Sequence, residues 1–597
     1  MASSYTVPHP FRSFLRKGWE AMKHNQPCSS GAKVLRWRRF ITPRPVAPLP
    51  AWMIFPAIFA ALGVSHLTLL KLPYYWDEAG YYIPAAWDFF RTGSLIPITT
   101  LSNAHPPLPS IYLALCWKLF GYCPLVTRLA VLGAAALGLT AVGRLAMRLV
   151  GVPAVAFWTI ALTALYPVWF AQSSLAHADI FAAACTLWGL ACALPAQDRV
   201  LHRKPWAAAL WFAVAALCKE TAIAIPLALA TVSLFESYRT PGMARIRLRR
   251  EAVWLAGCIL PLAAWFAYHC SKTGFLFGNP EFLRYNAQAN LEPLRFLAAF
   301  GHRILHLTAH MNLFVPVLLT FAALLLEPRG DREQGIGISE QGTAYGLDVD
   351  DSVGERQPRP AIAPDALRRI LLLLLVNALL FSLLGGALLT RYLLPMYPLV
   401  LLVAVSTFYH RVPYWQGLAA FCAAAFVLGI FINPPYGFAP EDNLDYARVI
   451  RLHQAGIAQL EERYPGATVL SAWPVTDELT RPELGYLKQP FSVAPIEDFS
   501  AAQIARAAQE PENFSAALVF STKADPSSPL FTLGQASKAM DERYFGLHHD
   551  LKSEEIALEL HGTLIWKQED HGQWIALIRF NRQLEARAED GNDLRLH

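Results

Sequence analysis

The sequence contains a long series of apolar stretches of about twenty residues, and no other feature limits its possible folds so strongly. A bilayer core about 30 Å thick is crossed by roughly 20 helical residues, because each residue advances a helix by about 1.5 Å. The region 206–236 is apolar but is interrupted by Lys219 and Glu220, so we interpret it as two short spans that meet at a membrane face. The other stretches of suitable length are 51–70, 126–149, 152–170, 179–195, 252–270, 311–327, 369–389, 392–409 and 415–432. We therefore predict an all-α polytopic membrane domain at 51–432, with about eleven transmembrane helices.

The composition excludes a cytosolic enzyme. Of the 597 residues, 54% are hydrophobic and only 16% are charged, whereas soluble domains carry about 25% charged residues. The formal net charge is +6, but Lys and Arg gather in short runs between the apolar stretches rather than on one basic face. We interpret these runs as charges that set membrane topology, and we predict no nucleic-acid partner.

The distribution of these basic residues predicts the orientation, because Lys and Arg near helix ends are retained on the cytoplasmic side. The tail 1–50 is rich in both residues and should be cytoplasmic. Counting spans from this tail places four further segments on the cytoplasmic side. They are the loop with Arg144 and Arg148, the loop with Arg199 to Lys204, the loop with Arg245 to Arg250, and the polar linker 328–368. The opposite face receives the loop 71–125, the turn near Asp179, the loop 271–310 and everything after 432. We expect a bacterial inner membrane protein whose C-terminal tail is periplasmic.

The tail 433–597 differs from the rest of the chain. A helical stretch around 443–463 precedes short apolar runs at 467–470, 516–520, 563–566 and 574–578, which polar or turn residues separate. Short apolar runs of this kind are typical of strands. We predict a soluble α/β domain on the outer face.

Two adjacent carboxylates, Asp77 and Glu78, lie inside an aromatic cluster just after the first span, between Trp76 and Tyr82. Farther along the same outer loop, His105 precedes the rigid pair Pro106-Pro107. Aromatic residues and solvated charges are both expected at a membrane interface, so a structural role for the pair stays open. The alternative is a polar site at the membrane face.

The order of these motifs resembles the GT-C superfamily of polyprenyl-phosphate-sugar glycosyltransferases. Within this superfamily, the chain looks most like the protein O-mannosyltransferases and the aminoarabinose transferases that modify lipid A. The resemblance covers about residues 50–410 and not the tail. It rests on Asp77-Glu78 after the first span, His105-Pro106-Pro107-Leu108, Arg128-Leu129 at the next span, Ala178-Asp179, Lys219-Glu220-Thr221, and Arg391-Tyr392 with Pro395 to Pro398. The aminoarabinose transferases carry Lys before the diproline, whereas this chain has His105, as the O-mannosyltransferases do, so the donor sugar stays open.

The resemblance implies transfer of a monosaccharide from a polyprenyl-phosphate donor to a lipid, glycan or protein acceptor. A carboxylate is suited to deprotonate the acceptor, and we assign Asp77 as general base with Glu78 as the reserve candidate. Cations are suited to the departing phosphate, so we assign Lys219 and Arg391 to it, with His105 and Tyr392. Weaker candidates for substrate binding are Asp179, Trp76 and Tyr82.

Several alternatives stay open. Lys219 and Arg391 could extend to the interface without a catalytic role, and Asp179 could cap its helix. A divalent metal held by Asp77, Glu78 and His105 is a further possibility. A multi-pass secondary transporter is the alternative function, although transporters place ionisable residues near the bilayer midplane. The enzyme hypothesis requires Asp77, Lys219 and Arg391 to converge on one lipid-accessible hollow at the non-cytoplasmic face.

Overall fold

The computed structural model describes residues 51–195, 204–278, 291–331, 360–384, 386–522 and 550–580, and the short pieces 280, 284, 357–358 and 543–545. The chain divides into two units, Met1–Ala51 and Trp52–His597. The predicted basic tail 1–50, most of the loop with Arg199 to Lys204 and most of the linker 328–368 lie outside the described residues. The elements below belong to the second unit, except that the first helix begins at Ala51.

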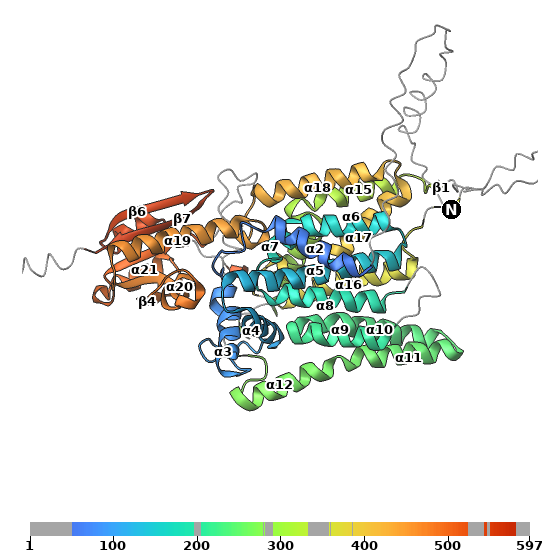
Figure 1. Cartoon of the computed structure of the whole chain (residues 1–597), viewed down its shortest axis with the longest axis horizontal. Coiled ribbons are helices and arrows are strands. Elements are labelled where there is room, and N and C mark those ends of the chain that lie inside the picture. Colours follow the sequence, from blue (N-terminus) through green and yellow to red (C-terminus); the bar gives the residue numbers. More distant parts are fainter. Residues whose placement is uncertain are drawn as a thin grey trace, which may run out of the picture. The chain divides into compact units, whose positions relative to one another are not determined.

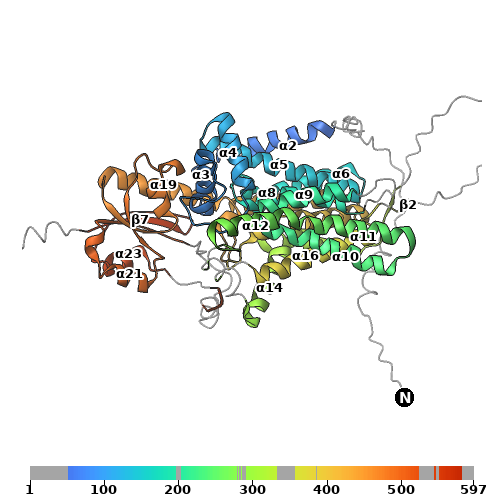
Figure 2. The ribbon, with the colours of Figure 1, turned by 90° about the horizontal axis from the view of Figure 1, so that it is seen from below.

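Apolar helices make up most of the second unit, and Figures 1 and 2 show many of them lying side by side. Each predicted span overlaps one of them. Four of them begin at a proline, which is tolerated at the first helical position because its missing N–H would have no partner there. These helices are α2 (Ala51–Ser65), α5 (Pro124–Leu149), α6 (Pro153–Leu165), α8 (Ala178–Ala193), α9 (Pro205–Cys218), α10 (Ala224–Arg239), α12 (Ile259–Thr273), α15 (Phe314–Leu324), α16 (Pro364–Leu383), α17 (Tyr397–Arg411) and α18 (Trp415–Phe431).

Four described helical stretches are long and apolar enough to cross a membrane alone, or five if the bent pair Pro293–Asn312 and Phe314–Leu324 counts as one span. The four are Pro124–Leu149, Glu220–Arg239, Gly242–Thr273 and Pro364–Leu383. Shorter apolar helices occupy most of the other predicted spans. The positions of the apolar segments are therefore as predicted, while the number of eleven spans stays a prediction.

One predicted cytoplasmic loop is helical. The segment with Arg245, Arg247, Arg249 and Arg250 forms α11 (Gly242–Gly257), which continues into α12 as a stretch of 32 residues. Arg, Leu and Ala favour helix, and no proline follows Pro241 until the helix is well established. A helix of this length is about 48 Å long, so it exceeds the hydrocarbon core.

The first outer loop folds into a short π-helical turn and two helices, which pack beside the apolar bundle near the tail (Figure 1). Gly93 ends the first of these helices in the left-handed region at φ +74°, where a side chain would be strained. The elements are η2 (Glu78–Tyr82), α3 (Ile83–Thr92) and α4 (Leu108–Phe120).

Further elements lie between the spans and after the last one. Among them, α14 and its extension bend by 98° relative to α15. These further elements are α7 (Pro167–Gln172), η3 (Glu220–Ile223), α14 (Pro293–Thr308), η5 (His310–Asn312), β1 (Gly330–Asp331), β2 (Gln357–Pro358), η6 (Thr390–Leu393) and η7 (Pro440–Asp442).

The tail forms a five-stranded sheet in the order β4-β3-β5-β7-β6, with helices packed against it. Strand β3 is parallel to β4 and β5, and β7 is antiparallel to β5 and β6. The elements are α19 (Asp445–Arg463), β3 (Thr468–Ala472), α20 (Val475–Thr480), η8 (Pro482–Leu484), β4 (Ser492–Ile496), α21 (Ala501–Ala507), η9 (Pro511–Asn513), β5 (Ala516–Phe520), α23 (Ser553–Glu559), β6 (Thr563–Asp570) and β7 (Gln573–Arg579). The four predicted strands and the predicted helix are confirmed.

The tail contacts the helical part closely. The Tyr486 hydroxyl donates to the Tyr74 carbonyl at 2.8 Å, and the Tyr122 hydroxyl donates to the Glu483 carbonyl at 2.6 Å. The indole of Trp473 lies against Gly80, so that a Cβ built on this glycine would be 2.6 Å from the indole nitrogen. The tail therefore packs on the turn that follows Asp77.

Candidate active site

Arg391, the second residue of η6, is the centre of a buried ionic cluster. Its side chain is 3% exposed, and three carboxylates surround the guanidinium. Nη2 donates to Asp77, Nη1 donates to Glu441 at 2.5 Å, and Nε lies 3.5 Å from Asp179 Oδ2. Sequence positions more than 300 residues apart thus meet at one arginine.

Lys219 joins the same cluster at the point where α9 ends. Its ammonium group donates to Asp179 Oδ1 at 2.5 Å and lies 4.2 Å from the centre of the Tyr392 ring. Asp179 is therefore shared by Lys219 and Arg391. The structure brings the three predicted residues into one cluster, Asp77 by its direct pair with Arg391 and Lys219 through Asp179, whereas the membrane face on which they lie stays a prediction.

Asp77 is the accessible member of the cluster. Its side chain is 32% exposed, whereas those of Asp179 and Glu441 are 4% exposed. Asp77 precedes η2, and Trp76 before it has a positive φ of 47°, which turns the chain sharply. A substrate can therefore reach Asp77 more readily than the other two carboxylates.

Glu78 has partners other than those of Asp77. Its side chain is fully buried and forms an ion pair with Arg128 at 2.5 Å. The backbone N–H groups of Tyr75 and Ala176 also donate to it, at 2.9 and 2.5 Å. Protein donors thus occupy both oxygens of the carboxylate predicted as the reserve base. Its geometry favours a role in holding the loop.

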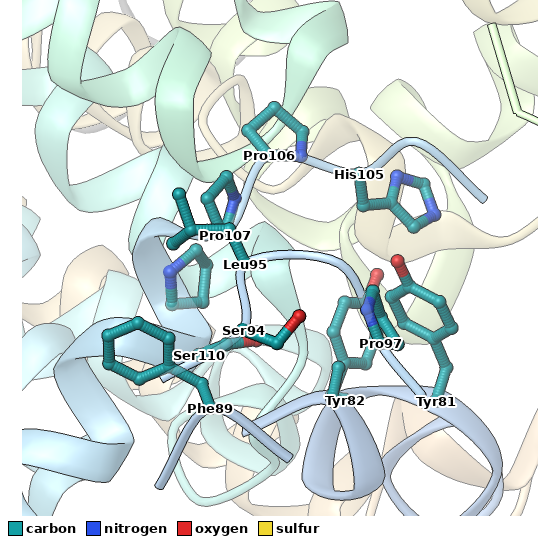
Figure 3. A pocket seen from close by; sticks show the side chains of 12 residues that line it. Tyr81, Tyr82, Phe89, Ser94, Leu95, Pro97, His105, Pro106, Pro107 and Ser110 are labelled. Atoms are coloured by element: carbon teal, nitrogen blue, oxygen red, sulfur yellow. The ribbon is translucent and has the colours of Figure 1, made fainter. Parts of the chain in front are cut away.

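His105 lines a separate small pocket, which is partly open to solvent. Its Nδ1 is 3.1 Å from Glu220, and its ring packs against those of Tyr81 and Tyr82. Figure 3 shows these two tyrosines beside His105, with Phe89 on another wall of the pocket.

Tyr82 links this pocket to the ionic cluster. Its ring lies 6.1 Å from that of His105 and 5.9 Å from that of His177, and His177 Nδ1 is 3.1 Å from Arg391 Nη1. Of the predicted substrate-binding residues, Asp179 thus belongs to the ionic cluster, and Tyr82 lies between this cluster and the pocket. Trp76 instead packs edge-on against Trp473 of the tail, with ring centres 5.0 Å apart.

The residues predicted as metal candidates do not fit one metal site. Asp77 pairs with Arg391, Glu78 with Arg128, and His105 with Glu220. Within the described ranges, no group of three His, Cys, Asp or Glu side chains is arranged to hold a metal ion.

Arg303 on α14 is a site residue that the motifs did not indicate. Its side chain is fully buried, Nε donates to the Phe381 carbonyl at 3.1 Å, and Nη1 donates to the Leu389 carbonyl at 2.8 Å. Its Nη2 has no hydrogen-bond partner among the residues that the structure describes. The guanidinium carbon lies 5.6 Å from the centre of the Tyr392 ring, which also contacts Lys219. Arg303 is thus a buried cation with donor capacity left over.

Glu441 and His177 are two further site residues that were not predicted from the sequence. The pKa of Glu441 is raised to about 8, mainly by burial. The charge of Arg391 lowers this pKa and offsets part of the effect, while the neighbouring carboxylates Asp77, Asp442 and Asp179 raise it further. Burial and the charges of Arg391 and Lys219 lower the pKa of His177 well below its usual value, so its ring is neutral. The acidic pair Glu441-Asp442, a few residues after the last span, was the available signal for Glu441.

A bundle of apolar helices with a buried ionic cluster beside a small sheet domain defines a polytopic membrane protein with a GT-C-like fold. The fold is similar to that of ArnT, a lipid A aminoarabinose transferase, from Cupriavidus metallidurans in its complex with undecaprenyl phosphate. That likeness has a TM-score of 0.51 at 14% identity and covers 88% of this chain and 97% of the ArnT chain. The apo form of the same protein gives a TM-score of 0.47 at 14% identity, with 88% and 98% covered.

The structural likeness is wider than the resemblance of the motifs. The matched region covers 88% of the chain, which is more than residues 1–432 contain. The structural likeness therefore includes part of the tail, where the motifs showed no resemblance. Neither a scan of protein-family models nor a comparison with curated proteins gives a match to this sequence.

Proposed function

We propose that this protein is an integral membrane glycosyltransferase that moves a monosaccharide from a polyprenyl-phosphate donor to a lipid, glycan or protein acceptor. The observation that carries the proposal is the convergence of Asp77 and Asp179 on Arg391, with Lys219 joined to the same cluster through Asp179. The GT-C-like fold supports it, since ArnT with this fold binds undecaprenyl phosphate.

Asp77 acts as general base in this proposal. Its carboxylate takes the proton of an acceptor hydroxyl while the hydroxyl oxygen bonds to the anomeric carbon of the sugar. The bond between that carbon and the phosphate oxygen breaks, and the lipid phosphate leaves with the electron pair. Because Asp77 is the exposed member of the cluster, it is the carboxylate placed to meet an acceptor.

Arg391 holds Asp77 rather than the donor phosphate in this mechanism. Three carboxyl groups already occupy its guanidinium, and a phosphate brought to the same arginine would be repelled by the negative charges of Asp77 and Asp179. The phosphate role that the motifs suggested for Arg391 therefore passes to Arg303.

Arg303, Lys219 and Tyr392 form the phosphate site that we propose. The Tyr392 ring lies near both cations: the guanidinium carbon of Arg303, whose Nη2 has no hydrogen-bond partner among the described residues, is 5.6 Å from the ring centre, and the Lys219 ammonium is 4.2 Å from it. Buried cations stabilise a leaving phosphate more strongly than cations in water, since the local dielectric constant is low. His105 contributes from the neighbouring pocket, whose aromatic and proline walls suit an uncharged part of the donor.

The charge distribution supports the placement of the enzyme in a bacterial inner membrane, with a cytoplasmic N-terminus and a periplasmic tail. The active face is then periplasmic. No step of the proposed reaction is assigned to a metal, since the candidate ligands are committed to separate ion pairs.

Mass spectrometry of the lipids and glycans of a strain that lacks this protein tests the proposal. We expect one sugar modification to be absent, to return with the wild-type chain, and to stay absent with Asp77→Asn at equal protein level. Asp365→Asn is the matched control, because Asp365 is a surface residue whose side chain is 77% exposed. An unchanged sugar profile in the deletion strain, or full restoration by Asp77→Asn, contradicts the proposal.

A further inference from the structure

Two consecutive residues of η6 pair with two consecutive residues of η7. The Thr390 hydroxyl donates to Asp442, and Arg391 Nη1 donates to Glu441 Oε2 at 2.5 Å. The side chains of Glu441 and Asp442 are 4% and 1% exposed. Because η7 is the next element after α18, the chain enters the tail domain through the residues that hold the arginine of the active site.

The η7 segment is held from several sides. His310 of η5 contacts Asp442 through Nε2 at 3.0 Å, and the amide of Gln172 at the end of α7 donates to the Glu441 carbonyl at 3.3 Å. The Asn443 side chain donates to Asn433 at 3.0 Å. Elements far apart in the sequence therefore fix the position of the Glu441 backbone.

The guanidinium group transmits this position to Asp77. Its nitrogens lie in one rigid plane, so an acceptor on Nη1 also sets the direction of the donors on Nη2. Glu441 accepts from Nη1, and Asp77 accepts from Nη2. An alternative partner on the Nη1 side is the ring of His177, whose nitrogens lie 3.1 and 3.3 Å away.

We propose that Glu441 is a positioning residue for the transfer step: it fixes the plane of the Arg391 guanidinium and so the orientation of Asp77. The segment that enters the tail domain thus completes the catalytic centre. This inference rests on the proposed function, because that function makes Asp77 the base.

The hydrogen bond, rather than the full charge of Glu441, is what the role requires. Asp77, Asp179 and Glu441 outnumber the two cations that they contact, so the cluster does not need all three negative charges. A glutamine at 441 keeps an oxygen that accepts from Arg391, whereas an alanine removes it.

The test compares full-length Glu441→Ala and Glu441→Gln with the matched control Glu478→Ala. Glu478 is also a buried glutamate of the tail, 1% exposed, but its partner is His453. The first measurement is the restored sugar modification in the deletion strain at equal protein level. The second is the affinity of the purified proteins for undecaprenyl phosphate. The third is phenylglyoxal modification of Arg391, followed by peptide mass spectrometry.

We expect Glu441→Ala to lower the sugar modification at least tenfold, to keep the undecaprenyl phosphate affinity within threefold, and to expose Arg391 to phenylglyoxal. Glu441→Gln should stay within threefold of wild type, and Glu478→Ala should lower thermal stability without exposing Arg391. If Glu441→Ala does not accumulate, Glu441→Asp is used instead. We expect this variant to lower the sugar modification at least threefold, because the shorter side chain holds the carboxylate farther from Arg391.

Protection of Arg391 in Glu441→Ala, together with normal sugar transfer, overturns the inference. Equal losses of transfer for Glu441→Ala and Glu478→Ala also overturn it, since they indicate a general loss of structure. Failure of the proposed function has a different signature. In that case the wild-type chain restores no sugar product in the deletion strain. Phenylglyoxal labelling of Arg391 still shows whether Glu441 holds Arg391.

Discussion

The two neighbouring carboxylates Asp77 and Glu78 each pair with an arginine, yet the two ion pairs differ in one respect. Arg128 donates to Glu78 and to the carbonyls of Ser174 and Pro73, and backbone N–H groups fill the rest of the Glu78 carboxylate. The Arg391 cluster is less complete. Among the described residues, Glu441 Oε1, Asp179 Oδ2 and Arg391 Nε have no hydrogen-bond partner.

This difference separates a structural ion pair from a candidate catalytic one. A buried pair in which both carboxylate oxygens accept hydrogen bonds from the protein holds the loop and leaves neither oxygen for a substrate. A cluster with unfilled atoms and one partly exposed carboxylate can take part in a reaction, at some cost to stability. The predictions that follow test this distinction.

The largest effect on stability is expected from Arg128→Ala. This change leaves the Glu78 carboxylate buried without its cation, which costs about 3–5 kcal/mol. We expect a large loss of monodisperse protein after detergent extraction and a strongly lowered thermal transition. Arg368→Ala is the control, because its ion pair with Asp365 is exposed and contributes at most about 1 kcal/mol. Normal stability of Arg128→Ala would contradict the structural role of this pair.

A smaller loss is expected from Gly80→Ala, which tests the contact between the tail and the Asp77 turn. The new Cβ would lie 2.6–2.9 Å from atoms of the Trp473 indole, and such overpacking costs about 1–3 kcal/mol. In the Trp473→Ala background the same change should cost much less, since the obstructing ring is gone. Thermal unfolding of the four proteins in this cycle measures the coupling.

Gly63→Ala is the matched control for that cycle. Gly63 lies inside α2, and nothing lies within 4 Å of a Cβ built there. Alanine is favoured over glycine in a helix, so the thermal transition should stay equal or rise. Additive effects of Gly80→Ala and Trp473→Ala would show that the predicted contact does not form.

Arg303→Gln tests the unfilled cation beside Tyr392. We expect the dissociation constant for undecaprenyl phosphate to rise about tenfold to hundredfold, because a charge-assisted hydrogen bond contributes about 1.5–3 kcal/mol. Arg91→Gln, at an exposed position at the end of α3, should leave the affinity unchanged. Titration of the purified proteins in nanodiscs gives both values. Equal affinities for wild type and Arg303→Gln would exclude Arg303 from the phosphate site.

The smallest effect concerns pH. The pKa of Glu441 is raised by burial to about 8 in the folded protein, so the folded state holds its proton more tightly than the unfolded state does. Its contribution to stability is complete below the unfolded value near 4.5 and is lost as the pH rises through 8. The thermal transition of the wild type should therefore fall between pH 5 and about 8 more steeply than that of Glu441→Gln. Parallel pH profiles would contradict the raised pKa.

Much of the fold could be predicted from the sequence, because apolar length and short apolar runs depend on local composition. Strand β4 was missed since Pro495 and Ser492 interrupt its pattern, although proline is tolerated at the edge position that β4 occupies. The helical course of the Arg-rich segment at 242–257 was also missed, because charge content alone does not distinguish a loop from the end of a long helix.

The candidate site could be predicted only where a motif marked it. Asp77, Asp179, Lys219 and Arg391 stand in recognisable short motifs at the ends of spans, and the structure brings them together. Arg303 stands in no such motif. Its significance comes from the lack of a carboxylate partner among the described residues, which depends on tertiary packing. Glu441 belongs to the tail, where the motif resemblance ended. The packing of the tail on the first outer loop was therefore beyond sequence reasoning.

The most direct test of the distinction between the two carboxylates compares Asp77→Asn with Glu78→Gln in the deletion strain, with the sugar modification normalised to folded protein. Asp77→Asn should lower transfer per folded molecule by about 10²-fold or more while stability stays near wild type. Glu78→Gln should lower the amount of folded protein, and the molecules that fold should transfer the sugar at nearly the wild-type rate. The reverse result, with transfer lost per folded molecule in Glu78→Gln and kept in Asp77→Asn, would contradict the account.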